Sequence, residues 1–382
     1  MRKHWIDNLR WVTVLLVLLY HVFYFYNNKG VFGGIGGFGE YPACPQYQDV
    51  IMYILYPWFM PLLFILAGIS SRYALQKQSA REWFRSRTRK LLVPGTIGLF
   101  VFQWIVGYFN TAVASAANGS SVLPQGVPGF VKYFAWSISG TGPLWFIQVL
   151  WLLCIVLLIV RALDRKDKFY NLCGKANIVV IILLGVLFWA GELTLIRNPR
   201  PESPDGLLNL YKPIFYMVPF LLGYFVFSHE AVQEKVAKAW IPLLAAAVVA
   251  GTVLIITTFG RDNTSPEYLQ QPLNCIYGWL ACLGLMGWFA ARFNTTGRFA
   301  GYMTRSSYGI YIVHYIVIAS LGYMMKVYTS LPPVAIYAIL TVAVFSLSPL
   351  LYELLRRIPF VRWATLGIKQ KCAKKPDNQM AG

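Results

Sequence analysis

Long uninterrupted apolar segments limit what this chain can fold into more than any other feature of its sequence. Four of the longest cover residues 11–26, 98–117, 144–160 and 178–190. A helix that crosses a lipid bilayer needs about 20 mostly apolar residues. Soluble domains carry roughly 25% charged residues, whereas only 13% of this chain's 382 residues are charged and 57% are hydrophobic. The sequence therefore predicts an all-α fold, a polytopic bundle of transmembrane helices.

The apolar segments divide into about ten stretches that are long enough to be transmembrane helices. No linker and no run of charges separates two halves of the chain. We therefore expect one integral membrane domain over residues 1–355, followed by a short basic tail over residues 356–382. The expected helices cover residues 9–28, 50–74, 92–117, 142–162, 177–196, 211–228, 240–259, 270–291, 306–327 and 333–355.

The positions of Lys and Arg predict how the helices are oriented. When the N-terminus is placed in the cytoplasm, 27 of the 34 Lys and Arg residues fall in cytoplasmic segments and 7 in outer segments. Basic residues collect in the cytoplasmic loops of membrane proteins. Both termini are therefore expected in the cytoplasm of a multi-pass protein of the plasma or inner membrane. The same rule accounts for the net charge of +19, so no nucleic-acid partner is expected.

The cysteines and glycines form two patterns that could be mistaken for binding motifs. The six cysteines have no CxxC spacing and most lie in or beside apolar segments, so we expect neither a disulfide framework nor a metal site. The glycine-rich segment 30–39 (GVFGGIGGFG) has the composition of a nucleotide-binding loop. Such a loop follows a strand and opens a helix, whereas this segment is expected to be an outer loop.

Ionisable side chains inside apolar segments are costly in a bilayer and are candidates for function. Four stand out: Arg10, His21, Glu192 and His314. His21 follows Arg10 by eleven residues on one predicted helix, which is about 16 Å along the axis and close to three whole turns. His21 is therefore expected near the middle of the membrane, on the same helix face as Arg10. There it can act as an acid or base, or it can be a neutral histidine hydrogen-bonded within the bundle.

His314 lies in the segment SSYGIYIVHY of the ninth expected helix. It is nine residues from Arg305 at the expected cytoplasmic edge, which places it about 13 Å deep. His21 and His314 could therefore meet inside the bundle. The position of His314 fits a catalytic role and a structural role equally well.

A dense basic cluster follows the second expected helix, in the segment SREWFRSRTRKLLVP. One interpretation is a topology signal that also contacts lipid head groups. The other is a phosphate-binding site, because guanidinium groups bind phosphate oxygens in pairs. The cluster consists of Arg81, Arg85, Arg87, Arg89 and Lys90.

Taken together, five segments resemble the acyltransferase 3 family of membrane O-acyltransferases. The opening helix, IDNLRWVTVLLVLLYH, has the basic residue, ten intervening residues and histidine of the family signature. FMPLLFILAGISSR, FRSRTRKLLVP, GPLWFIQVLW and SYGIYIVH are similar, in this order, to four later family segments. Two positions depart from the family pattern, because Ala67 stands where serine is usual and Lys90 where arginine is usual. The resemblance extends from residue 5 to about residue 320.

The resemblance implies an enzyme that takes an acyl group, most often acetyl, from acyl-CoA in the cytoplasm. The acceptor would be a hydroxyl group of a carbohydrate or glycolipid, on the outer side of the membrane or within it. His21 matches the family's intramembrane histidine, and Arg10 matches its first-helix basic residue. The family's RxR motif has two possible matches, Arg85–Arg87 and Arg87–Arg89, and both stay open. Acetyl-CoA would be a donor co-substrate rather than a tightly bound cofactor, and no fused SGNH domain is expected.

The residues and the resemblance combine into one hypothesis. His21 is a general base that deprotonates the acceptor hydroxyl, or it briefly carries the acyl group. Arg10 positions the CoA or the thioester carbonyl, and His314 supports the site or binds the acceptor. The other expected site residues are Arg85, Arg87, Arg89 and Lys90 for acyl-CoA binding, and Trp145 and Tyr311 along the acceptor path.

Two other functions compete with acyl transfer. An exporter or flippase would move a glycan or lipid without acyl chemistry, and Pro57, Pro61 and Pro219 could break helices for that purpose. The sequence has no internal repeat of the kind that many transporters have. A sensor would use an intramembrane histidine to report ligand or pH. The sequence makes no prediction of the oligomeric state.

Overall fold

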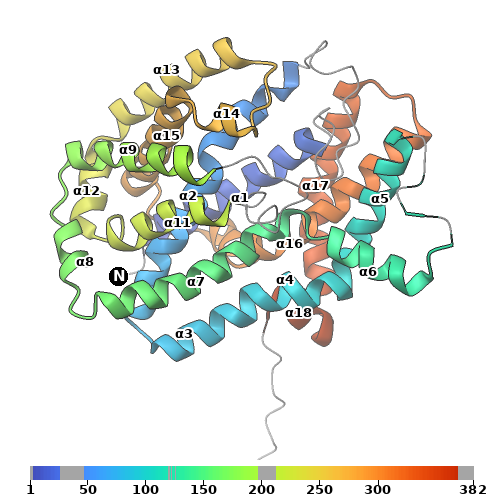
Figure 1. The fold of residues 1–382 in the computed structure, drawn as a ribbon, viewed down its shortest axis with the longest axis horizontal. Coiled ribbons are helices and arrows are strands. Elements are labelled where there is room, and N and C mark those ends of the chain that lie inside the picture. The colour runs from blue at the N-terminus through green and yellow to red at the C-terminus, as the bar shows by residue number, and fades with distance from the viewer. Residues whose placement is uncertain are drawn as a thin grey trace, which may run out of the picture.

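The computed structural model describes residues 3–25, 47–118, 121, 123–124, 126–196 and 212–368. Every regular element within these ranges is helical, which confirms the predicted all-α fold (Figure 1). The same ranges contain nine helices or helix runs long and apolar enough to cross a membrane, or ten when the bent pair α11 and α12 counts as one span. The glycine-rich segment 30–39 lies outside the described residues.

Each of the ten predicted segments contains a helix. In chain order, these helices are α1 (His4–Phe25), α2 (Val50–Leu75), the run from α3 (Ala80–Arg87) through α4 (Val93–Gly98) to α5 (Trp104–Asn118), α7 (Trp145–Leu163), α9 (Ile178–Leu195), α11 (Pro213–Phe225), α13 (Trp240–Thr258), α15 (Pro272–Arg292), α16 (Arg298–Tyr328) and α17 (Pro333–Leu355). Five shorter helices lie between or after them: α6 (Gly129–Ser139), α8 (Lys168–Cys173), α12 (Glu230–Lys238), α14 (Pro266–Leu269) and α18 (Pro359–Leu366).

Several helix boundaries differ from the sequence prediction, and three of the differences are informative. The third span begins at Ala80 rather than at residue 92, and the ninth begins at Arg298 rather than at residue 306. Hydropathy marks only the apolar part of a helix, whereas polar turns continue it, as where Ser79 caps α3. The sixth span is the 13-residue α11, which bends by 102° into α12. Thirteen residues reach about 20 Å, less than the ~30 Å hydrocarbon core.

The segment expected as a basic tail contains a helix, α18, that packs against α4. A Cβ added to Gly98 would lie 2.9 Å from the carbonyl oxygen of Ala364. Gly367 ends α18 with a φ of +61°, a left-handed conformation that favours glycine at this position. A Cβ there would lie 2.6 Å from the carbonyl oxygen of Arg89. The end of α18 therefore supports the segment that carries the basic cluster.

α1 lies inside the bundle, where it contacts α2, α15, α16 and α17 (Figure 1). Its buried residues are distributed around the helix, as is typical of a helix enclosed on most sides. At its start, Nδ2 of Asn8 donates to the carbonyl oxygens of Phe293 and Thr295 at 2.7 and 2.8 Å. These bonds fix α1 to the connection between α15 and α16, so polar groups on α1 are held in the interior.

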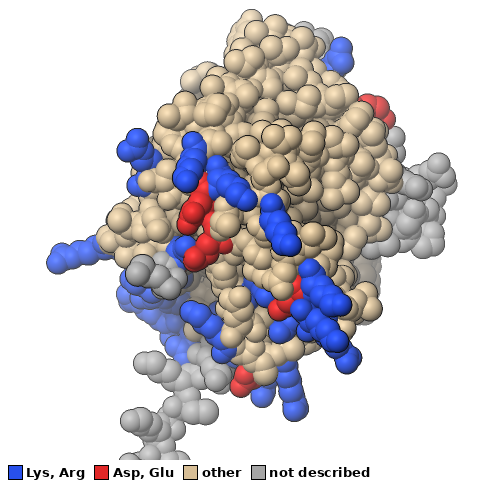
Figure 2. Space-filling view, turned by 90° about the vertical axis from the view of Figure 1, so that its left-hand side faces the viewer, with Lys and Arg blue, Asp and Glu red and all other residues tan. Residues whose placement is uncertain are grey.

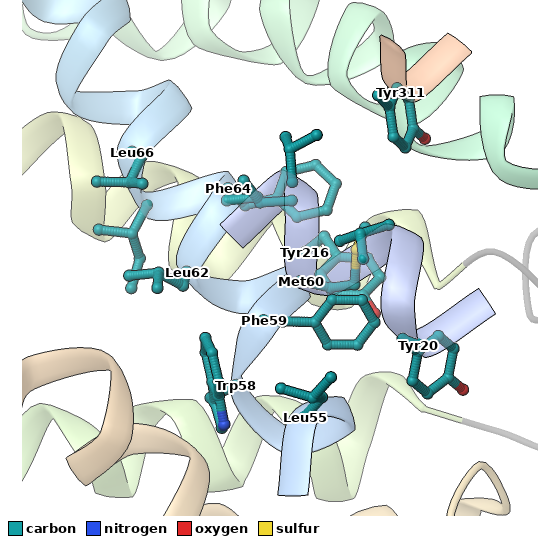
Figure 3. Packing of buried hydrophobic residues seen from close by; sticks show 14 of the residues in the cluster. Tyr20, Leu55, Trp58, Phe59, Met60, Leu62, Phe64, Leu66, Tyr216 and Tyr311 are labelled. Atoms are coloured by element: carbon teal, nitrogen blue, oxygen red, sulfur yellow. The ribbon is translucent and has the colours of Figure 1, made fainter. Parts of the chain in front are cut away.

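α2 and α11 cross at close range because two glycines face each other. A Cβ added to Gly68 would lie 2.1 Å from the carbonyl oxygen of Phe220, and one added to Gly223 would lie 2.2 Å from that of Ile65. Small residues allow helices in a membrane to approach this closely. The crossing places Tyr216 of α11 against α2, where its ring stacks on Phe64 at 4.5 Å (Figure 3).

Lys and Arg side chains gather on one end of the bundle, shown face-on in Figure 2. We call it the basic end, and it carries residues 81–90, 161–175 and 235–238. Arg72 donates to both carboxylate oxygens of Asp167 there, at 2.9 and 3.1 Å, and its guanidinium lies 3.6 Å over the ring of Tyr170. The guanidinium holds the pKa of the Asp167 carboxyl below its usual range. These contacts attach α2 to the connection between α7 and α8.

Replacing Gly223 with alanine is expected to push α2 and α11 apart, because the new methyl group meets the backbone carbonyl of Ile65. Overpacking of this kind costs about 1–3 kcal/mol. Gly301→Ala is the matched control, since the nearest atom to its added Cβ is 3.6 Å away on a flexible arginine. Thermal unfolding of the purified variants should show a lower melting temperature for Gly223→Ala alone. A melting temperature equal to that of the wild type would contradict the close crossing.

Candidate active site

α1 and α2 together hold the side chain of Arg10. Its Nη1 donates to Oδ1 of Asp7, one turn earlier on α1, at 3.1 Å. Its Nη2 donates to Oγ of Ser70 on α2 at 2.6 Å. Arg10 is half-buried. Its guanidinium is therefore oriented by one charged and one neutral neighbour.

α1 and α16 bring His21 and His314 together in the interior of the bundle. Nδ1 of His21 lies 3.1 Å from Nε2 of His314, and the two ring centroids are 5.0 Å apart. His314 is fully buried, whereas His21 is half-buried. The two imidazoles therefore meet, as their similar expected depths suggested.

Two backbone carbonyl groups determine which ring nitrogens carry protons. Nδ1 of His21 is 2.8 Å from the carbonyl oxygen of Val17, and Nδ1 of His314 is 2.5 Å from that of Tyr311. A carbonyl oxygen can only accept a hydrogen bond, so we assign the proton to Nδ1 in both neutral rings. Nε2 of His314 then accepts a hydrogen bond from the Nδ1–H group of His21. The carbonyl oxygen of Val17 accepts a hydrogen bond from the same N–H group.

This assignment leaves Nε2 of His21 with a free lone pair. Within the described ranges, this nitrogen forms no hydrogen bond. It can take up a proton, because the acceptors on Nδ1–H stabilise the imidazolium that results. The same lone pair can attack a carbonyl carbon. The arrangement therefore provides a general base or a nucleophile at one defined atom.

Three tyrosine rings stand edge-on around His21. The ring centroids of Tyr315, Tyr20 and Tyr24 lie 5.4, 5.6 and 6.4 Å from that of His21, with interplanar angles of 82°, 79° and 90°. Tyr315 follows His314 on α16, and the other two lie on α1. The immediate surroundings of His21 are therefore aromatic, with polar groups at the ring edges.

Of the two residues predicted to line an acceptor path, Tyr311 lies against His314. Tyr311 stacks on His314 at 5.8 Å, and its hydroxyl donates to the carbonyl oxygen of Pro143. Trp145, at the start of α7, packs against Tyr216 at 5.4 Å. Tyr311 therefore packs against His314, and its hydroxyl already has a hydrogen-bond partner.

The basic cluster divides into inward and outward residues. Arg87 and Arg89 are half-buried, whereas Arg85 and Lys90 are exposed. The chain forms a π-helix over Thr88–Leu92, and such segments are frequent at functional sites. Nε of Arg89 is buried and has no hydrogen-bond partner within the described residues. Of the two possible RxR matches, Arg87–Arg89 is the one that faces inward.

One stretch of α16 connects the basic cluster to the histidine pair. The hydroxyl of Tyr308 donates to the carbonyl oxygen of Lys90, and Tyr311 follows one turn later. His314 lies one further turn along, six residues from Tyr308, or about 9 Å. The same helix therefore fixes both the basic cluster and the interior pair.

Sequence reasoning missed three polar side chains at this site. Ser70 orients Arg10, and Nε2 of Gln103 donates to the carbonyl oxygen of Ile312 at 2.9 Å, next to the histidine pair. The third is Tyr20, whose buried hydroxyl has no partner among the described residues. Ser70 and Gln103 are polar residues within apolar segments, and that contrast is the signal that could have found them.

Glu192, the fourth intramembrane candidate, lies away from the histidine pair. Its carboxylate accepts a hydrogen bond from the thiol of Cys275, between α9 and α15. Cys154, Cys173, Cys275 and Cys282 are free thiols. In the part of the chain that the structure describes, no three His, Cys, Asp or Glu residues gather as a metal site.

Comparison with protein families matches residues 3–353 to a family described as an acyltransferase domain. The match runs from before α1 to near the end of α17, so it includes the histidine pair, Arg10 and the basic cluster. Comparisons with curated proteins and with solved structures give no match.

Proposed function

Because the chain belongs to the acyltransferase 3 family, we propose that this membrane acyltransferase moves an acyl group, in the first place acetyl, from acyl-CoA to a hydroxyl group of a carbohydrate or glycoconjugate. The observation that carries the proposal is the free Nε2 of His21 beside His314. An alcohol becomes a strong nucleophile when a base removes its proton, and Nε2 of His21 is placed to do so.

The orientation of the protein follows from its charge. The Lys and Arg side chains of Figure 2 support placing the basic end in the cytoplasm. Acyl-CoA would then enter from this end, and the acceptor would approach from the opposite end. We place the protein in the plasma or inner membrane on the same reasoning.

Acyl-CoA is expected to bind at the basic end. Its 3′-phospho-ADP group is polyanionic, and guanidinium groups bind phosphate oxygens through paired hydrogen bonds. Arg87 and Arg89 are half-buried there, and Nε of Arg89 has no partner within the described residues. We therefore favour the Arg87–Arg89 match. The exposed Arg85 and Lys90 would add long-range attraction.

The chemical step is expected at Nε2 of His21. Nε2 takes the proton of the acceptor hydroxyl as its oxygen attacks the thioester carbon. The tetrahedral intermediate collapses, the C–S bond breaks, and the proton passes from Nε2 to the sulfur, so that an ester and CoA–SH leave. His314 accepts the Nδ1–H group throughout and stabilises the imidazolium. In the second possible route, Nε2 attacks the thioester carbon, the C–S bond breaks and CoA leaves as the thiolate. The acceptor oxygen then attacks the acyl carbon, the C–N bond breaks, and the hydroxyl proton neutralises the CoA thiolate.

Arg10 fits contact with CoA better than contact with the thioester carbonyl. It precedes His21 by eleven residues on a continuous helix, about 16 Å along the axis. The thioester carbon must lie at His21 when it reacts. Arg10, oriented by Asp7 and Ser70, is therefore assigned to the CoA moiety.

The exporter alternative rested on prolines that could break helices. α2 is continuous through Pro57 and Pro61, and α11 is continuous through Pro219. None of these prolines interrupts its helix, so the prolines do not favour transport over acyl transfer.

His21→Ala is expected to abolish acyl transfer, because general base catalysis contributes about 10²- to 10⁴-fold. The measurement is incorporation of label from [14C]acetyl-CoA into membrane glycoconjugates, with membrane levels checked by immunoblot. His4→Ala, a histidine at the other end of α1, is the matched control and should retain activity. Normal transfer by His21→Ala would overturn the mechanism.

His314 is expected to act as a positioning residue. His314→Leu removes the acceptor for Nδ1–H of His21, and a charge-assisted hydrogen bond contributes about 1.5–3 kcal/mol, so kcat should fall about 10- to 100-fold. The KM for acetyl-CoA should not change. His314→Gln, whose amide oxygen can replace Nε2 as acceptor, should recover part of the rate. Equal rates for the two variants would indicate a packing role only.

Arg87→Ala and Arg89→Ala are each expected to weaken acyl-CoA binding about 10-fold, because each removes a charge-assisted contact to phosphate. Arg81→Ala is the matched control, since Arg81 is exposed on the same helix run. Titration of the purified protein with acetyl-CoA measures the affinity. Unchanged affinity in both variants would mean that the basic cluster acts only as a topology signal and a lipid contact.

A further inference from the structure

Three tyrosines form a stacked group beside His21, on the side away from Arg10. We call Tyr20, Tyr24 and Tyr56 the tyrosine cluster. The ring of Tyr20 is stacked against those of Tyr24 and Tyr56, at 5.7 Å in both cases and at angles of 19° and 27°. Tyr20 and Tyr24 lie on α1 and Tyr56 lies on α2. The cluster is thus built from the two helices that also carry His21 and the Arg10 contact.

The hydroxyl of Tyr20 marks this cluster as more than packing. Tyr20 is 4% exposed, and its hydroxyl has no hydrogen-bond partner within the described residues. Buried polar atoms are nearly always hydrogen-bonded, so each exception needs an explanation. In Figure 3, the Tyr20 ring lies beside Phe59 and its hydroxyl points away from the packed apolar residues. A ligand atom would satisfy this hydroxyl.

Further polar groups converge on the same place. Nζ of Lys212, at the start of α11, donates to the hydroxyl of Tyr56 at 3.3 Å. Tyr24, Tyr56 and Lys212 are only half-buried. The region therefore combines accessible aromatic surface with several hydrogen-bonding groups.

The mixture of groups indicates the chemical class of ligand. An acyl chain would cover the rings but leave the buried Tyr20 hydroxyl without a partner, which is costly. A nucleotide phosphate would be drawn to the basic end instead. A sugar ring has apolar C–H faces for the aromatic surface and hydroxyl groups for the polar atoms, the combination that small-molecule sites usually match.

We infer that the tyrosine cluster with Lys212 is the acceptor subsite, in which one glycosyl ring packs on Tyr24 and Tyr56 and hydrogen-bonds to Tyr20 and Lys212. The inference rests on the proposed function and gives it a location. Tyr20 directly precedes His21, and the two rings meet edge-on at 5.6 Å. A sugar bound to the Tyr20 hydroxyl would therefore lie next to the imidazole ring that carries Nε2.

The test measures donor and acceptor kinetics separately on the purified full-length protein. The donor is [14C]acetyl-CoA, and the acceptor probes are the methyl glycosides of glucose, galactose, rhamnose and N-acetylglucosamine. Label in neutral glycoside reports transfer, and label in free acetate reports transfer to water. The probe that accepts label best is then used with Tyr20→Phe, Tyr56→Leu and the control Tyr323→Phe. Tyr323 is a half-buried tyrosine on α16, outside the tyrosine cluster.

Tyr20→Phe removes one oxygen and should raise the glycoside KM about 3- to 10-fold, the effect of one hydrogen bond. Tyr56→Leu should raise it about 10-fold or more, because it removes a stacking surface and the Lys212 contact. Tyr323→Phe should leave the glycoside KM unchanged. The KM for acetyl-CoA should stay within 2-fold in all three variants, since the donor binds at the basic end.

Each failure has its own meaning. If the wild type releases no label from acetyl-CoA, the proposed function is wrong. If it forms acetate but acetylates none of the four glycosides, the sugar subsite is wrong while donor chemistry stands. An unchanged glycoside KM in Tyr20→Phe and Tyr56→Leu would show that the tyrosine cluster serves only in packing and does not bind the acceptor. A raised KM for acetyl-CoA would assign the cluster to the donor and overturn the inference.

Discussion

The hydrogen bond between His21 and His314 is the interaction on which the proposed chemistry depends. The orientation of each ring is set locally, because each Nδ1 bonds to a carbonyl oxygen on its own helix, that of Val17 or Tyr311. The distance between the rings is set by the packing of α1 against α16. Nε2 of His21 is therefore left free only when both the hydrogen bonds to the helix carbonyls and the packing of α1 against α16 are in place.

The bilayer explains why this arrangement uses helix carbonyls. Inside the hydrocarbon core every polar group must find its partner within the protein. A carbonyl oxygen has two lone pairs, so it can accept a second hydrogen bond while it serves the helix. The enclosure of α1 and the close crossing of α2 and α11 then keep the interior dense enough to hold the pair. Nε2 of His21 stays free because the partners of Nδ1 come from the scaffold itself.

Much of this site was predictable from the sequence, since depth in a membrane follows from helix rise. The eleven residues between Arg10 and His21, and the nine between Arg305 and His314, placed the two histidines at similar depths. Helix rise does not tell which helices are neighbours. The resemblance connected the segments, and the structure then showed the 3.1 Å contact.

Other features could not be predicted, for physical reasons. Within the π-helix at residues 88–92, Thr88 and Lys90 accept hydrogen bonds from α7 and α16, contacts that no local pattern records. Ser70 became significant only when α2 was placed beside Arg10. The tyrosine cluster was hidden because tyrosines are common in packing and at membrane interfaces. Only the absence of a partner for one hydroxyl within the described residues separates Tyr20 from the rest.

The placement of the proposed subsites bears on the choice between the two chemical routes. The basic cluster connects to the histidine pair along α16, whereas the tyrosine cluster meets His21 from α1 and α2. Donor and acceptor would therefore bind against different helices and could be bound at the same time. Direct attack of the acceptor on the thioester needs both substrates together, with His21 as the base between them. An acyl-histidine intermediate is required only when the two substrates must take turns at one place, so this arrangement favours the general-base route.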